Sequence, residues 1–213
     1  MKIEKLASFV ADRPVFDAEM LRVGKADPRS VNVQLSRWKK AGKIIQLRRG
    51  LYLMNNPYIK LPSGYDLYIA GALHCPSYIS LHKALEYHGL IPEGVPVYTC
   101  VTTRRPVTLR NPVGEFSYRH LRQGLFWGYE KVDTGAGEFF VATPEKALLD
   151  LFYLDGVKIG AAYLEELRLQ NLGALDLVRL AAFARRAAGP GLTKAAELLA
   201  AYVKARAGEG KYL

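Results

Sequence analysis

Histidine and cysteine side chains are the first candidates for chemistry in this sequence. His74, Cys75, His82, His88 and Cys100 lie in one stretch of the chain. Their order matches neither Cys-x-x-Cys nor His-Glu-x-x-His, the spacings typical of zinc ligands. Partly buried histidines and thiols explain these residues better. We therefore predict no metal site and no cofactor.

Carboxylates are the next candidates, because general acid–base chemistry needs two of them to converge. Glu145, Asp150 and Asp155 fall on separate turns, and the sequence gives no reason for them to meet. The glycines of residues 134–138 lack the Gly-Lys-Ser/Thr ending of a phosphate-binding loop. We expect no enzyme. A nuclease or nucleotidyltransferase is the enzymatic alternative, and it would show activity that depends on a divalent metal.

Positive charge is the strongest remaining signal. The 213 residues carry a formal net charge of +10, and residues 1–60 hold 13 Lys and Arg against 5 Asp and Glu. The remaining residues are nearly balanced. This asymmetry predicts a nucleic-acid-binding head on an almost neutral body. The alternative is a basic surface that only improves solubility.

A helix over residues 28–41 could present that charge. Asp27 is a capping residue, Pro28 suits the first helical position, and Gly42 ends the segment. Val31, Leu35 and Trp38 form the apolar stripe. The opposite face, with Val33 among its members, combines base-reading and phosphate-holding side chains: Arg29, Asn32, Ser36, Arg37 and Lys40. The alternative is an ordinary solvated face.

The elements around this helix predict how it is held. Ile3 to Val10 has helical periodicity, and Asp17 begins a second short helix that Gly24 ends. A β-hairpin follows over residues 43–54, with basic residues at Lys43, Arg48 and Arg49. Three helices and a hairpin are the order of a winged helix–turn–helix domain. In such a domain the third helix enters the major groove, while Arg48 and Arg49 touch phosphates or the minor groove.

Proline, glycine and asparagine punctuate residues 55–64, so we place a linker there. The first domain is residues 1–60, and residues 61–213 form a second. Helices are expected over 65–73, 81–88, 144–152, 161–170, 175–187 and 193–207, and strands over 95–102, 114–119 and 138–142. Residues 135–137 are expected to form a hairpin turn. The fold class is therefore α+β, with a helical C-terminal half.

The second domain has basic residues of its own, interleaved with aromatic side chains. They are Arg104, Arg105, Arg110, Arg119 and Arg122. Arginines among aromatics can bind nucleic acid or an acidic protein. The alternative is that their aliphatic stems cover a half-buried sheet.

Composition also bears on location. No run of 18 apolar residues occurs, so no membrane span is expected. The first residues carry charges where a signal peptide needs apolar ones. Two cysteines cannot build a disulfide framework. We expect a cytoplasmic protein.

Several segments together resemble a known family. Residues 48–52 (Arg-Arg-Gly-Leu-Tyr), 76–81 (Pro-Ser-Tyr-Ile-Ser-Leu), 84–92 (Ala-Leu-Glu-Tyr-His-Gly-Leu-Ile-Pro) and 142–150 (Ala-Thr-Pro-Glu-Lys-Ala-Leu-Leu-Asp) are similar to AbiEi-type antitoxins of type IV toxin–antitoxin systems. The similarity spans roughly residues 1–155.

The resemblance implies a transcriptional repressor that binds inverted repeats in its own promoter, as a monomer in solution or a weak dimer on DNA. It also implies that the second domain counters a nucleotidyltransferase toxin without forming a stable complex, and helps to hold double-stranded DNA. The alternatives are a protein-interaction module, or a solitary DNA-binding regulator without a cognate toxin.

Overall fold

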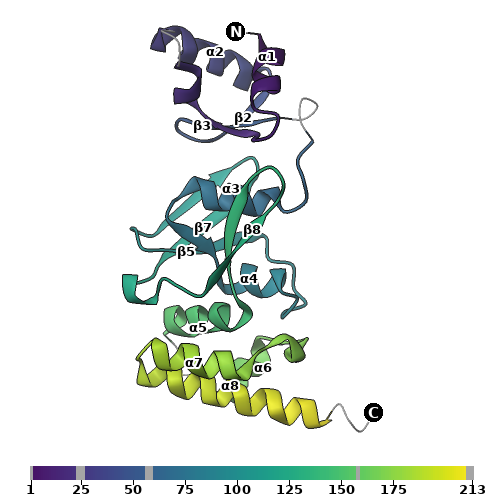
Figure 1. Ribbon diagram of the computed structural model, residues 1–213, viewed down its shortest axis with the longest axis vertical. Coiled ribbons are helices and arrows are strands. Elements are labelled where there is room, and N and C mark those ends of the chain that lie inside the picture. The colour runs from purple at the N-terminus through teal and green to yellow at the C-terminus, as the bar shows by residue number, and fades with distance from the viewer. Residues whose placement is uncertain (1, 23–26, 56–59, 157–158, 210–213) are drawn as a thin grey trace.

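The protein is a mixed α+β chain whose parts are stacked along one axis (Figure 1). The computed structural model describes residues 2–22, 27–55, 60–156 and 159–209. Within these ranges it contains eight α-helices and two β-sheets. The N-terminal helices lie at one end, the larger sheet in the middle, and the C-terminal helices at the other end.

The N-terminal part begins with α1 (Ile3–Phe9) and reaches its longest helix at α2 (Pro28–Lys40). The predicted start of α2 is confirmed, because the Asp27 carboxylate accepts a hydrogen bond from the Ser30 N–H at 2.9 Å and Pro28 opens the helix. Its end is confirmed too, since Gly42 adopts a φ of +66°. The hairpin that follows consists of β2 (Ile44–Arg48) and β3 (Leu51–Met54).

Between α1 and α2 the structure differs from the prediction. The expected second helix is a single 3-10 segment, η1 (Ala18–Arg22), and the Asp17 carboxylate accepts from the Glu19 N–H. Gly24, expected to end it, lies outside the described residues. A strand that the sequence did not predict, β1 (Val15–Asp17), pairs antiparallel with β3. The result is a three-stranded sheet in the order β1-β3-β2.

This sheet has two buried faces. On one face Phe16, Ile44 and Met54 pack against the buried sides of α1 and α2. The other face joins the larger core of residues 65–203 through four side chains: Val15, Leu47, Leu51 and Leu53. Hydrogen bonds cross the same boundary, because the Val15 N–H donates to Tyr65 Oη at 3.1 Å and Asn111 Nδ2 donates to the Leu47 carbonyl at 3.2 Å. The sheet is therefore a layer shared by both parts.

The middle of the molecule is a six-stranded sheet in the order β6-β7-β5-β4-β9-β8. The predicted strands are confirmed as β5 (Val97–Thr102), β7 (Gly114–His120) and β9 (Glu138–Ala142). Gly135, at a φ of +81°, lies in the hairpin turn between β8 and β9. Three further strands were not predicted from the sequence: β4 (Ser77–Ile79), β6 (Val107–Asn111) and β8 (Tyr129–Asp133). Pairs β5–β7 and β4–β9 are parallel, and the others are antiparallel.

Helices cover both faces of this sheet. On the side of α3 (Tyr65–Leu73), Tyr118 Oη donates to the Ala70 carbonyl at 2.6 Å. On the side of α4 (Leu81–Tyr87), Thr99 Oγ1 donates to the Ser80 carbonyl and accepts from the Lys83 N–H. The expected helices at 65–73 and 81–88 are thus present. Ser80 occupies the N-cap position of α4, but its hydroxyl makes no capping bond.

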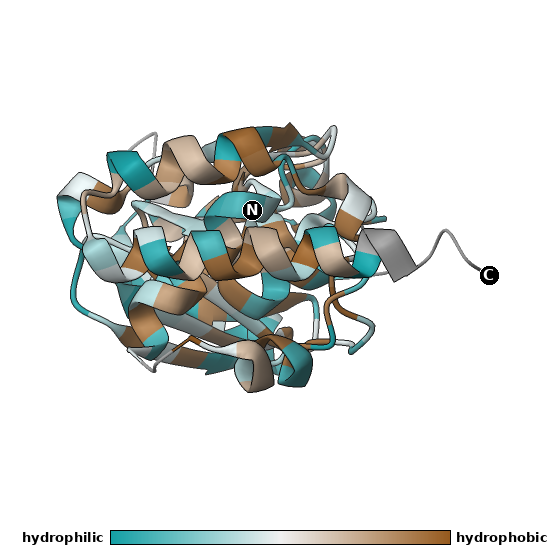
Figure 2. Ribbon diagram, turned by 90° about the horizontal axis from the view of Figure 1, so that it is seen from below, coloured by the Kyte–Doolittle hydropathy of each residue, from teal (hydrophilic) through white to brown (hydrophobic). Residues whose placement is uncertain are grey.

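The C-terminal helices stack beneath the sheet. Thr143 caps α5 (Pro144–Asp155) through its hydroxyl oxygen, as expected. The chain continues with α6 (Ala161–Glu166), η3 (Leu172–Ala174), α7 (Leu177–Arg186) and α8 (Pro190–Glu209). The short helix η2 (Gln123–Leu125) lies earlier in the chain, between β7 and β8. The helix expected over 193–207 begins earlier in the structure, so Gly191 lies inside α8. Viewed from this end, hydrophilic and hydrophobic residues alternate along the helices (Figure 2). In the described ranges, no helix combines the length and apolarity that crossing a bilayer would require.

Candidate nucleic-acid interface

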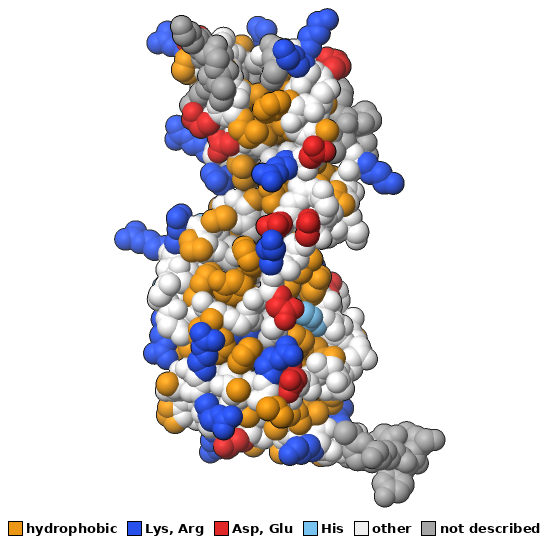
Figure 3. Space-filling view, in the orientation of Figure 1, with side chains coloured by type: hydrophobic (Ala, Val, Ile, Leu, Met, Phe, Trp, Pro, Cys, Tyr) orange, Lys and Arg blue, Asp and Glu red, His pale blue; other side chains and the backbone are white. Residues whose placement is uncertain are grey.

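The outer face of α2 is an exposed, basic surface of the N-terminal part. Val31, Leu35 and Trp38 are buried, and the side of α2 opposite them faces solvent. The five predicted polar residues of this face are all exposed: Arg29, Asn32, Ser36, Arg37 and Lys40. The helix itself contains no Asp or Glu. In Figure 3, Lys and Arg side chains project around the N-terminal end of the molecule.

A hollow of about 650 Å³ separates α2 from the turn of the hairpin. Asn32, Ser36 and Lys39 follow one another at i, i+4 and i+7 along one wall of it. The opposite wall includes Arg49 and Gln46, and Lys39 Nζ donates to Gln46 Oε1 at 2.9 Å. Sequence reasoning missed Lys39 and Gln46, together with Tyr52, Asp17 and Glu19 of the same hollow. The spacing of Lys39 from Asn32 was a usable signal for the first of these.

Arg48 and Arg49 have different surroundings, although they are adjacent in sequence. Arg49 lines the hollow beside α2. The pKa of His74 is held below its ordinary value of 6.5 mainly by burial, and then by the positive charges of Arg104 and Arg48. Arg48 is therefore close to the second part, where Arg104 and Arg105 are exposed on the turn between β5 and β6. Lys43 precedes β2 at the end of the hairpin remote from both arginines.

The five arginines of the second part do not form one patch. Arg110, on β6, makes a two-pronged ion pair with Glu115 at 2.9 and 3.2 Å. Arg119, near the other end of β7, donates to Asp155 at 2.9 Å and also to the Leu154 carbonyl, which ties the sheet to the end of α5. Arg122 is exposed, and its guanidinium lies 5.6 Å from the centre of the Tyr153 ring.

The histidines and cysteines are not brought together. No group of three or more His, Cys, Asp or Glu side chains in the described part of the chain is arranged to hold a metal ion. His88 Nε2 lies 2.7 Å from the Ala142 carbonyl oxygen. Cys100 is fully buried, and burial raises the pKa of its thiol above the usual range.

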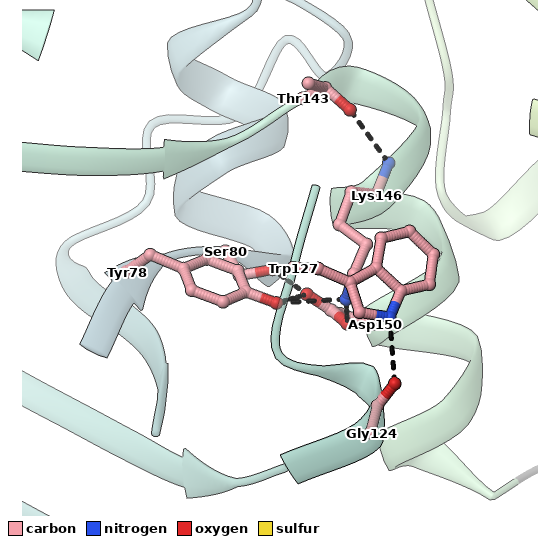
Figure 4. A network of polar contacts seen from close by, with 7 residues as sticks. All are labelled: Tyr78, Ser80, Gly124, Trp127, Thr143, Lys146 and Asp150. Atoms are coloured by element: carbon pink, nitrogen blue, oxygen red, sulfur yellow. Dashed lines mark hydrogen bonds and ion pairs between the residues drawn. The ribbon is translucent and has the colours of Figure 1, made fainter. Parts of the chain in front are cut away.

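A buried polar network joins the sheet to α5, and sequence reasoning did not anticipate it (Figure 4). Asp150 Oδ2 accepts from Tyr78 Oη and from Ser80 Oγ, both at 2.8 Å. Lys146, one turn earlier on α5, forms an ion pair with Asp150 and donates to Tyr78 Oη at 2.9 Å. The Trp127 ring covers the network, with its centre 5.1 Å from Lys146 Nζ.

Burial governs the electrostatics of this pair. It raises the pKa of Asp150, and the positive charge of Lys146 opposes that rise. Burial also lowers the pKa of Lys146, and Asp150 opposes that change. Both side chains are only 2% exposed, and the neighbouring cavity is about 10 Å³, too small for a ligand. The arrangement therefore fixes α5 against β4 and α4 and is closed to substrate.

No protein-family model matches the sequence, and a search among characterised proteins found no match.

Proposed function

We propose that the N-terminal part is a winged helix–turn–helix domain that binds duplex DNA. In this proposal α2 is the recognition helix and β2 and β3 form the wing. The supporting observation is that α2 exposes a polar and basic face without a carboxylate of its own, and that Arg49 lines the same hollow as Asn32 and Ser36 of this helix. An α-helix fits the major groove, where Arg and Asn can read base edges while Lys and Ser hold phosphates.

The second part extends this surface. Arg48 of the wing and Arg104 of the second part both lower the pKa of His74, and Arg105 follows Arg104 in the chain. Three arginines at the junction between the two parts would neutralise phosphates that flank the site under α2. We leave Arg110 and Arg119 out of this surface, because the positive charge of each is balanced by a neighbouring carboxylate.

The biological role that we propose follows the resemblance to AbiEi-type antitoxins. The protein would repress its own operon at inverted repeats in the promoter and counter a nucleotidyltransferase toxin without a stable complex. We assign no catalytic reaction to the chain. Two of the segments that carry the resemblance, 76–81 and 142–150, supply Tyr78, Ser80, Lys146 and Asp150, which join β4 and α4 to α5.

Base-reading residues are expected to affect sequence preference. Arg37→Ala or Asn32→Ala should weaken binding to the promoter duplex by about 1–3 kcal/mol and leave binding to scrambled DNA nearly unchanged. A gel-shift series with both duplexes measures the ratio of the two affinities. An equal loss on promoter and scrambled DNA would show that these side chains do not read bases.

Phosphate-binding residues are expected to act on every sequence alike. Lys40→Ala or Arg49→Ala should weaken promoter and scrambled duplexes by the same factor, and reduce the slope of log K against log salt by about 1. Fluorescence anisotropy over a salt series measures that slope. Arg110→Ala is the matched control, because its guanidinium is paired with Glu115. If none of the four substitutions in α2 and the wing changed binding, the DNA-binding function would be wrong.

The interaction-module alternative makes a different prediction for the full chain. A Lys40→Ala/Arg49→Ala variant that no longer binds DNA would still rescue cells from the toxin if protein neutralisation were the sole function. Repression measured with a promoter reporter in the same cells separates the two roles. A promoter that neither the wild type nor this variant represses would favour the alternative.

A further inference from the structure

Val33 is an apolar residue in the middle of a polar, basic face. Its side chain is 50% exposed, and it lies on the side of α2 opposite the buried stripe. Arg29 lies one turn before it and Arg37 one turn after it. No carboxylate lies on this helix.

Packing does not account for a valine at this position. Among the described residues, Val33 belongs to neither of the two hydrophobic clusters. A β-branched side chain is also a weaker helix former than alanine, so Val33 does not strengthen α2. Its apolar branches are available to a partner.

The major groove presents one apolar group to such a helix, the 5-methyl group of thymine. We propose that Val33 contacts this methyl group and thereby selects thymine at one position of the DNA site. The inference rests on the proposed DNA-binding function and specifies how that site reads sequence. Arg29 and Arg37 lie roughly 6 Å to either side along the helix axis, which is about two base steps. Guanines that accept from these arginines are therefore expected to flank the thymine.

The experiment replaces thymine by deoxyuridine, which removes the methyl group alone. Duplexes are first selected from a randomised pool with the full-length protein, and each thymine of the selected site is then replaced in turn. At one position the wild-type protein should lose about fourfold in affinity, the effect of exposing one buried methyl group. Val33→Ala should lose about the same factor on the thymine duplex and be indifferent to deoxyuridine at that position.

Val178→Ala is the matched control, because Val178 is another exposed helical valine, on α7, far from α2 in the sequence. It should bind both duplexes as the wild type does. Thermal unfolding of Val33→Ala should be unchanged or shifted upward, since alanine is the better helix former. The methyl contact would be overturned if deoxyuridine weakened DNA binding by Val33→Ala as much as binding by the wild type. It would also be overturned if deoxyuridine weakened binding by the wild type at no position. Neither result would contradict the DNA-binding function. A pool from which the wild type retains no duplex at low salt would overturn the DNA-binding function as well.

Discussion

Asp150→Asn is expected to lower the free energy of unfolding by about 3–5 kcal/mol, because it leaves the Lys146 ammonium without its counter-charge in a site that is 2% exposed. The amide also cannot accept both hydroxyl hydrogen bonds while serving the lysine. Tyr78 and Ser80 then lose a strong acceptor. Urea denaturation followed by circular dichroism measures the loss.

Two comparisons make this prediction specific to the buried pair. Glu138→Gln is the matched control, because the Lys131–Glu138 pair is more than half exposed, and its loss should change the free energy of unfolding by less than about 1 kcal/mol. The double variant Lys146→Met/Asp150→Leu should recover much of the stability that Asp150→Asn loses, since it removes both charges. Equal effects of Asp150→Asn and Glu138→Gln would contradict our account of the network.

Leu53→Ala is expected to have an effect of similar size, a loss of about 2–5 kcal/mol in the free energy of unfolding. Leu53 is 2% exposed and lies on the face of the three-stranded sheet that joins the larger core. A cavity there weakens the contact between the two parts. We therefore expect one cooperative unfolding transition, displaced as a whole to a lower temperature.

Scanning calorimetry measures this transition, and Val178→Ala serves as its surface control, because Val178 is 79% exposed. Two separate transitions, of which Leu53→Ala moved only one, would show that the parts unfold independently. The same burial argues against testing residues 1–60 alone. That fragment would expose Val15, Leu47, Leu51 and Leu53 to water, and apolar patches of this kind promote association.

Helices with clear ends could be predicted from the sequence. The Asp27-Pro28 and Thr143-Pro144 starts each place a capping side chain before a proline, and both carboxylate and hydroxyl caps are present. These signals are local, so no tertiary contact is needed to interpret them. The exposed face of α2 could be predicted for the same reason, because its apolar stripe fixes which residues remain outside.

Short strands could not be predicted. Strands β1 and β4 have three residues each, too few to show an alternating pattern. They exist because neighbouring strands offer hydrogen-bonding edges, and the sequence does not display that condition. The pairing of Arg119 could not be predicted for a similar reason. Its partner, Asp155, lies far along the chain, on a helix that packs under the sheet.

Only part of the buried network could be predicted from the sequence. Lys146 and Asp150 stand four residues apart, a spacing that permits an ion pair on one helix. Its partners Tyr78 and Ser80 come from a distant segment, and only the packing of α5 against β4 and α4 brings them within reach. Burial is therefore a tertiary property that no local pattern revealed.

The three-stranded sheet, which both parts share, limits how this protein can be re-engineered. If residues 2–55 are transplanted onto another scaffold, that scaffold must supply an apolar surface that packs against Val15, Leu47, Leu51 and Leu53. Redesigning the outward residues of α2 requires no such match, because those side chains touch neither core. Retargeting the head in place is consequently the simpler design route, and moving it demands a rebuilt interface.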